Sequence, residues 1–341
     1  MFPVPKTSSK YEWQASASIE TIKLRAQTLR QIRTFFDKQG VLEVDTPTLS
    51  SSTIPDPFIE SFQTQYIPLT QTMQNNLYYL HTSPEFPMKR LLAGGSGSIY
   101  QISKVFRQGE VSAKHNPEFT LLEWYRVDWD HRQLMQEVSQ LLTELLTSFM
   151  QLDETVFISY KEAFQKEFGF NPHTVSKSEL IKCTEQIGLA DVLNLDEDKD
   201  RFLELLFSHK IEPSLGKSKD DNAHICLLYN YPATQASLAK ISMENNYPVA
   251  QRFEVFINGI ELGNGFNELN DAQEQKKRFT MENKLRVEAG QLDVPLDERF
   301  LACLDSLPQC AGVAIGIERL LMIMSQKKHI NEVIAFPFEK A

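Results

Sequence analysis

Apolar positions between Ser18 and Gly40 recur at steps of three and four residues. This spacing places them on one face of an α-helix, the face that packs against a core. The predicted stripe consists of Ile22, Ala26, Leu29, Ile32 and Phe36. Gly40 is a typical helix end, and the apolar residues of 41–44 then predict a strand that stops before Pro47.

Three short apolar segments predict further strands, at 77–80, 98–103 and 119–125. Asp130 is placed to cap a long amphipathic helix that follows them. Its predicted buried face consists of Leu134, Val138, Leu141, Leu142 and Leu145. Residues from about 160 to 219 have a helical and strongly charged pattern, which predicts a helical insertion packed on the main domain.

The clearest local signal is the dipeptide Asn258-Gly259 between two apolar segments. Asn-Gly favours a two-residue hairpin turn. That turn places Phe256 opposite Glu261, so Glu254 lies diagonally from Glu261 on the same face. Two carboxylates there repel each other unless a cation or a polar ligand lies between them. The alternative is an acidic side that faces solvent.

The rest of the pattern indicates the fold class. A charged helix is predicted around 273–290, followed by a Gly-rich strand-to-helix junction at 312–319. Strands joined by hairpins, with helices gathered elsewhere, predict an α+β fold on a mainly antiparallel sheet flanked by helices. The first 17 residues are polar and rich in Pro and Ser. We therefore expect a flexible arm at 1–17 and one domain at 18–341.

Composition excludes several classes of protein. The chain has 341 residues, of which 42% are hydrophobic and 23% charged, as in ordinary globular proteins. A formal net charge of −10 disfavours non-specific nucleic-acid binding. The four cysteines form no C-x-x-C pair, which disfavours zinc and disulfide frameworks. No apolar run of membrane-spanning length and no secretory leader are present, so we expect a cytoplasmic protein.

Three clusters carry candidate chemistry. In the first, Arg107 stands at a predicted strand end, before Glu110 and the segment HNPEF at 115–119. A guanidinium offers a rigid fork of donors that suits phosphate. The alternative is an Arg in a surface salt bridge, which contributes little.

The second cluster is the segment ELGNGFNE at 261–268. Glu261 and Glu268 are candidates to share a hard cation such as Mg²⁺, which favours carboxylate and phosphate oxygens. Gly263 and Gly265 let the backbone approach a ligand closely. The alternative is a glycine-containing turn with solvated acids.

The third cluster is the junction at 312–319, where Arg319 falls in the first turn of the predicted helix. A helix N-terminus beside an Arg binds anions, although Gly-rich junctions are also common without any ligand. Two Arg-bearing anion sites and a carboxylate hairpin together are the parts of a Mg-ATP site. Neither a P-loop nor a G-x-G-x-x-G segment after a strand is present, which disfavours the usual nucleotide-binding folds.

These segments resemble the signature motifs of class II aminoacyl-tRNA synthetases of the lysyl subgroup. The helix and strand that run to Pro47 look like motif 1, residues 106–123 like motif 2, and residues 312–319 like motif 3. The segments SPE at 83–85, MKRLL at 88–92 and ELGNGFNE at 261–268 match the lysyl subgroup. The resemblance runs from about Ser18 to the C-terminus. It implies a class II catalytic domain that forms a homodimer through motif 1.

The resemblance also implies an ATP site. Arg107 is expected to hold the α-phosphate and Arg319 the γ-phosphate. Glu261 and Glu268 are expected to hold Mg²⁺, and Phe119 is expected to stack on adenine. The other implied ATP-binding residues are Gln108, Gly109, Glu110, Asn116, Leu262 and Gly316.

For the amino acid, the resemblance implies an acidic pocket. Glu85 is expected to bind the amino group near the reacting carboxylate, while Glu123, Tyr125 and Glu268 surround the distal ammonium. The other implied pocket residues are Ser83, Pro84, Asn264, Phe266 and Ala314. Several acceptors around one point charge suit a cationic amino acid.

The chain differs from true lysyl-tRNA synthetases in several ways. The resemblance leaves no room for an anticodon-binding domain before Ser18 or after Arg319, so we expect none. Three positions also carry other residues. Ala314 replaces Gly, Ser83 replaces Ala, and Glu318 replaces Asp. All of these except Glu318 match a shorter paralogous family, the elongation factor P β-lysine ligases. Gly109 replaces the Glu of both families, and Glu110 is its candidate substitute.

The implied activity is ATP-dependent activation of (R)-β-lysine, or lysine, and its transfer to a lysine side chain of elongation factor P. One alternative is a truncated lysyl-tRNA synthetase that charges tRNA. An ammonia-using amide synthetase on the same fold would need a basic pocket, and Glu123 and Glu268 oppose it. A non-catalytic regulatory paralogue is the last alternative, and the retained arginines and glutamates of the ATP site oppose it.

Overall fold

The computed structural model describes residues 13–68, 77–190, 192–194, 197–218 and 222–341. Among these residues one large sheet has the strand order β1-β5-β6-β12-β11-β10-β8-β7, with β9 paired to β10. β1 pairs with β5 and β7 with β8 in parallel, and the other neighbours are antiparallel. The strands are β1 Leu42–Glu43, β5 Ile99–Phe106, β6 Glu118–Val127, β7 Val156–Ser159, β8 Cys226–Pro232, β9 Ile241–Glu244, β10 Tyr247–Ile257, β11 Ile260–Asn267 and β12 Cys310–Gly316.

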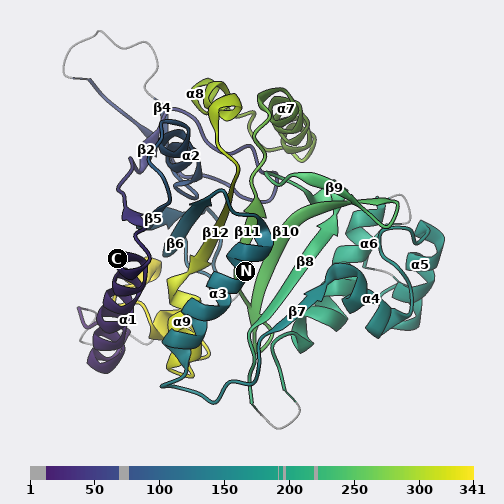
Figure 1. Ribbon diagram of the computed structural model, residues 1–341, viewed down its shortest axis with the longest axis horizontal. Coiled ribbons are helices and arrows are strands. Elements are labelled where there is room, and N and C mark those ends of the chain that lie inside the picture. The colour runs from purple at the N-terminus through teal and green to yellow at the C-terminus, as the bar shows by residue number, and fades with distance from the viewer. Residues whose placement is uncertain (1–12, 69–76, 191, 195–196, 219–221) are drawn as a thin grey trace.

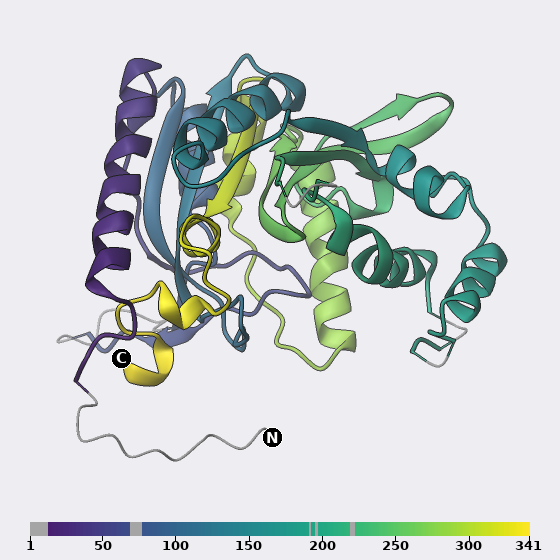
Figure 2. The same ribbon diagram turned by 90° about the horizontal axis from the view of Figure 1, so that it is seen from below.

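Helices flank this sheet, and a smaller sheet of β2 (Leu49–Ser50), β4 (Leu77–Leu80) and β3 (Gln63–Gln65) lies beside it. Helix α1 lies at one end of the molecule, and α4, α5 and α6 gather at the other end (Figures 1 and 2). This α+β architecture confirms the predicted fold class. The helices are α1 Ile19–Lys38, α2 Glu85–Ala93, α3 His131–Leu146, α4 Tyr160–Phe168, α5 Lys177–Gln186, α6 Lys199–Leu206, α7 Ala272–Glu288, α8 Glu298–Cys303 and α9 Ile317–Met324.

Side-chain caps start the two long helices where the sequence predicts them. Ser18 accepts a hydrogen bond from the backbone of Thr21 at the start of α1, and Asp130 forms a capping box with Gln133 on α3. All five predicted core positions of α3 are buried. The stripe on α1 is only partly correct, because Ala26 is exposed. The buried residues of α1 are Thr21, Thr28, Ile32, Phe35 and Phe36.

The hairpin between β10 and β11 forms at Asn258-Gly259, which have φ angles of +53° and +69°. Phe256 pairs with Glu261 as predicted, but a β-bulge follows. Glu254 therefore lies opposite Asn264, one residue farther along β11 than the uninterrupted register gives.

Helices α4, α5 and α6 occupy most of the segment that the sequence marks as helical and charged. They share a core with β8 and β10 that includes Tyr160, Phe164, Phe202, Leu228 and Phe256. The status of this segment as an insertion stays a prediction.

The four cysteines are free thiols; Cys226 and Cys310 are buried, and Cys183 and Cys303 are partly exposed. Across the described residues, no helix combines the length and the apolar character that crossing a membrane requires.

Candidate active site

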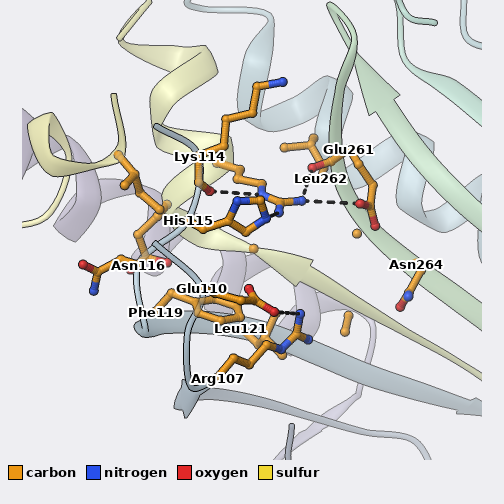
Figure 3. A pocket seen from close by; sticks show the side chains of 16 residues that line it. Arg107, Glu110, Lys114, His115, Asn116, Phe119, Leu121, Glu261, Leu262 and Asn264 are labelled. Carbon is orange, nitrogen blue, oxygen red and sulfur yellow. Dashed lines mark hydrogen bonds and ion pairs between the residues drawn. The ribbon is translucent and has the colours of Figure 1, made fainter. Parts of the chain in front are cut away.

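Two adjoining cavities open along β6, β11 and β12, and they share Arg107, Leu121, Asn264 and Ala314. We name the first the arginine cavity and the second, of about 160 Å³, the glutamate cavity. The arginine cavity (Figure 3) is further lined by Glu110, Lys114, His115, Asn116, Phe119, Glu261, Leu262, Gly263, Gly316, Glu318, Arg319 and Ile330. The glutamate cavity is further lined by Ile54, Asp56, Ile59, Thr82, Ser83, Glu85, Glu123, Tyr125, Ser237, Leu238, Arg252, Phe266, Glu268, Gly312 and Val313.

Arg107 follows β5 and lies at the junction of the two cavities. Its guanidinium carbon is 5.1 Å from the centre of the Phe119 ring, and Nη1 is 3.8 Å from the Glu110 carboxylate. Figure 3 shows the Glu110 carboxylate turned toward this guanidinium. Nε of Arg107 is buried and has no hydrogen-bond partner among the described residues. An unpartnered buried donor on a cation suits an anionic ligand such as phosphate.

Arg319 enters the arginine cavity from the first turn of α9. Its Nη1 donates to the carbonyl of Glu261 at 2.8 Å, and its Nη2 donates to Nε2 of His115 at 2.5 Å. Burial and the charge of Arg319 lower the pKa of His115, so its ring stays neutral and can accept this bond. Nδ1 then donates to Ser112 at 2.7 Å. Sequence reasoning did not single out His115, although it lies in the recognised HNPEF segment.

Glu318 connects three separate elements beneath the arginine cavity. Its carboxylate accepts from the backbone of Thr120 on β6 at 2.8 Å and pairs with Arg25 on α1 at 2.8 Å. The side chain is buried, so both carboxylate oxygens need these partners. Glu318, which replaces the usual Asp, therefore forms an ion pair with α1, the helix that resembles motif 1.

The loop after Arg107 differs in part from the implied ATP site. Asn116 and Phe119 line the cavity, whereas Gln108 and Gly109 are not among the described residues that line it. Gln108 instead bonds through its backbone to Glu60 at 2.8 Å. Gly109 has a φ of +83°, a left-handed conformation that glycine adopts without strain and a Glu would not.

Three carboxylates meet in the glutamate cavity, on α2, on β6 and just after β11. Tyr125 donates to Oε1 of Glu123 at 2.7 Å, and Oε2 of Glu123 has no hydrogen-bond partner among the described residues. Burial, together with the nearby charges of Glu85 and Glu268, raises the pKa of Glu123 to about 8. Burial also raises the pKa of Glu268. Such a pocket favours a cation that restores the ionised carboxylates.

β12 forms the floor between the two cavities. Gly312 lies opposite Tyr125, and a Cβ there would collide with the Tyr125 ring and approach Oε1 of Glu268 to 2.5 Å. Ala314 lies opposite Glu123 and lines both cavities. The space above β12 therefore depends on the small side chains of Gly312 and Ala314.

The SPE segment leads into α2. Ser83 lines the glutamate cavity and accepts from the backbone of Glu85 at 3.3 Å. Pro84 is the residue before the first turn of α2 and is not among the described residues lining the cavity. Its implied contact with the amino acid stays a prediction.

The two residues expected to hold a metal together, Glu261 and Glu268, line different cavities. They are seven positions apart, with Glu261 on β11 and Glu268 just after it. An extended strand separates such positions by roughly 20 Å, too far for one ion. Glu254, on the neighbouring strand β10, lies opposite Asn264; burial and then the charge of Glu261 raise its pKa. Within the described residues no group of three or more His, Cys, Asp or Glu side chains is arranged as a metal site.

A loop from the N-terminal half closes the glutamate cavity through Ile54, Asp56 and Ile59. Arg286 on α7 holds this loop and is 1% exposed. Its guanidinium donates to the carbonyls of Asp56 at 2.8 Å and Ile59 at 3.3 Å and pairs with Glu60 at 2.8 Å. Sequence analysis did not identify this anchor.

Comparison with known proteins places the chain in a family. Residues 9–340 match the family described as tRNA synthetases class II (D, K and N). Proteins named elongation factor P–(R)-β-lysine ligase are similar over almost their whole length. The protein of Pectobacterium atrosepticum is 42% identical over 98% of this chain and 100% of its own. That of Hamiltonella defensa is 44% identical with the same coverage, and that of Vibrio cholerae is 44% identical over 97% of this chain and 99% of its own. These relatives are ligases, and the chain is therefore a member of the class II tRNA synthetase family, an ATP-dependent ligase of the elongation factor P–(R)-β-lysine ligase group.

Proposed function

We propose that this chain activates a diamino acid, (R)-β-lysine or lysine, with ATP and transfers it to a lysine side chain of elongation factor P. The observation that carries the proposal is the junction of the two cavities at Arg107 and Ala314. One cavity offers guanidinium groups for a triphosphate, and the other offers three carboxylates for ammonium groups. The names of the relatives support the same substrates.

The first step joins the amino acid to AMP. A carboxylate oxygen of the amino acid attacks the α-phosphorus of ATP, and the bond to the departing pyrophosphate breaks. Arg107 is positioned to bind the α-phosphate at the junction, and Arg319 to bind the far end of the triphosphate. The chain mainly orients the two reactants and stabilises negative charge as it develops.

A magnesium ion bound with ATP would neutralise further phosphate charge. Glu261 fits this role, because it lies in the arginine cavity beside Arg319. Glu254 is a candidate partner on the neighbouring strand, although it also pairs with Arg252 at 2.5 Å. Repulsion between Glu254 and Glu261 contributes to the raised pKa of Glu254, and a nearby cation would relieve that repulsion.

The second step transfers the aminoacyl group to protein. The neutral amine nitrogen of a lysine side chain attacks the carbonyl carbon of the adenylate, an amide bond forms, and AMP leaves. The attacking nitrogen loses a proton to solvent or to the departing phosphate. We also propose a homodimer through the motif 1 segment around residues 40–47, where the apolar side chain of Leu42 is exposed.

Two linked reactions test the proposal. ATP–pyrophosphate exchange is measured with lysine and with (R)-β-lysine, and the activated enzyme is then offered elongation factor P or tRNA. We expect exchange with a diamino acid and transfer to elongation factor P. Transfer to tRNA alone would favour the truncated synthetase, and no exchange with either amino acid would refute the proposed activation.

A further inference from the structure

A buried lysine lies directly behind the acidic groups of the glutamate cavity. Lys89, on α2, has a relative exposure of 0%. Its Nζ is 2.5 Å from Oε1 of Glu85 and 2.5 Å from Oε2 of Glu268. Lys89 is not among the described residues that line the cavity. Its charge therefore lies beneath the carboxylates and leaves the cavity itself free for a ligand.

This lysine changes the charge of the site. Glu85, Glu123 and Glu268 carry three negative charges when ionised, and Lys89 reduces the total of this cluster to two. Asp56, Arg107 and Arg252 line the same cavity, but Arg252 pairs with Glu254 and Arg107 lies at the junction with the arginine cavity. Burial alone would lower the pKa of Lys89, but the carboxylates of Glu268 and Glu85 outweigh that effect and raise it. Lys89 is therefore a permanent cation at physiological pH. Removing it would leave three buried carboxylates without a counter-charge, and buried unpaired charges take up protons instead.

We propose that Lys89 is a positioning residue that fixes the net charge of the cluster of Glu85, Glu123 and Glu268 at two negative charges and so selects an amino acid with two ammonium groups. The inference rests on the proposed function. Lys89 engages Oε1 of Glu85 and Oε2 of Glu268, and Glu268 also accepts a backbone hydrogen bond from Gly312. In the proposed reaction the carboxylate of the amino acid faces ATP, so its two ammonium groups neutralise this cluster. An amino acid with one ammonium leaves a buried carboxylate uncompensated.

Other titratable groups surround the cluster without replacing Lys89. Among the described cations, Lys89 alone forms ion pairs with both Glu85 and Glu268. Lys240 exerts only a longer-range interaction with Glu268. Further titratable neighbours are Tyr125 on β6, Cys310 on β12, Glu282 on α7 and Cys303 on α8. The lining of the cavity adds Asp56, Arg107 and Arg252.

The test compares Lys89→Met with Arg90→Met, the next residue on α2, which is exposed. The measurement is kcat/KM in ATP–pyrophosphate exchange for the better of lysine and (R)-β-lysine, and for norleucine, which lacks the distal ammonium. Because Lys89→Met breaks a buried charge pair, we expect its kcat/KM for the diamino acid to fall by at least about 30-fold. The ratio of kcat/KM for the diamino acid to that for norleucine should fall by a similar factor. Arg90→Met should stay within about twofold of wild type.

The pH profile separates an electrostatic role from a merely structural one. Without Lys89 the carboxylates ionise at higher pH, so the rising limb of kcat/KM should move upward in pH. A structural defect would lower kcat/KM without moving that limb. The inference is overturned if the rising limb of the Lys89→Met profile does not move, or if the preference of this variant for the diamino acid over norleucine is unchanged. In either case, exchange by the wild-type enzyme still supports the proposed function. Absence of exchange in wild type refutes the proposed function itself.

A second pair of variants keeps the test decisive if Lys89→Met does not fold. Glu85→Gln leaves one net negative charge, whereas Glu85→Gln with Lys89→Met restores two. The double variant should therefore prefer the diamino acid over norleucine more strongly than Glu85→Gln does. The opposite order would overturn the inference.

Discussion

Glu123→Gln tests the acidic pocket with a minimal change of shape. The amide of Gln keeps an oxygen that can accept the 2.7 Å hydrogen bond from Tyr125. It removes only the negative charge and the unpartnered Oε2 that we assign to the distal ammonium. Glu118→Gln is the matched control, because Glu118 lies on the same strand but is exposed and pairs with Lys104.

The magnitude follows from two opposing contributions. An ammonium about 4 Å from a carboxylate gains about 4 kcal/mol at an effective dielectric constant of about 20. At pH 7 the substrate must first displace the proton from a carboxyl whose pKa is about 8, which costs about 1.4 kcal/mol. The difference predicts a loss of nearly 100-fold in kcat/KM at pH 7, growing toward about 1,000-fold at pH 9.

Glu123→Gln should lower kcat/KM but raise the stability of the free enzyme at high pH. The pKa of Glu123 is raised from 4.5 to about 8, so the folded state holds this proton more tightly than the unfolded state. The stability that Glu123 contributes is therefore full below pH 4.5 and is lost as pH rises through 8. Its loss is on the order of 5 kcal/mol at most. Glu123→Gln should accordingly melt at higher temperature than wild type at pH 9, with little difference at pH 5.

The assay combines exchange kinetics for the diamino acid with thermal melting, both from pH 5 to pH 9. Two results would show that Glu123 does not bind the ammonium. One is a kcat/KM of Glu123→Gln within about threefold of wild type at pH 9, far below the expected factor. The other is an equal loss in Glu118→Gln.

The remaining predictions concern the phosphate site, the floor and the assembly. Arg107→Ala and Arg319→Ala should each lose adenylate formation, since truncating a buried charged partner costs about 2–5 kcal/mol or more; near-normal pyrophosphate exchange in either would contradict this. Ala314→Gly should raise kcat/KM for α-lysine relative to (R)-β-lysine, because one methyl in a pocket is worth about 1–3 kcal/mol, and a ratio within about twofold would show that Ala314 does not set specificity. Light scattering at micromolar concentration should give twice the mass of one chain, and a monomeric mass would refute a dimer through the segment that contains Leu42.

Local signals in the sequence predicted local structure well. The caps at Ser18 and Asp130, the turn at Asn258-Gly259 and the junction before Arg319 all form where short-range chemistry places them. Each depends on a few neighbouring residues whose hydrogen bonds or φ angles are nearly independent of the rest of the fold. The position of Arg107 at a strand end is correct for the same reason.

The sequence was less informative about which side chains share a cavity. For Glu261 and Glu268 a signal against a shared metal was available, because the same sequence predicts an extended strand that holds the two positions apart. The sequence marked Lys89 only in part. It lies in the MKRLL segment and four positions after Glu85 on one helix, but its second partner, Glu268, lies 179 positions away and only the assembled fold brings them together. The bulge beside Glu254 was not predicted from the sequence either.

The anchor at Arg286 has a consequence for how the enzyme is made. Its hydrogen bonds to Asp56 and Ile59 span 230 and 227 positions, so one wall of the glutamate cavity is held by a helix synthesised much later. Contacts of such long sequence separation form slowly, because a long loop must close before they contribute. A nascent chain that ends before α7 therefore has the early strands of the site without a closed pocket. Binding of the amino acid becomes available only near the end of folding, which makes it a late reporter of the native state.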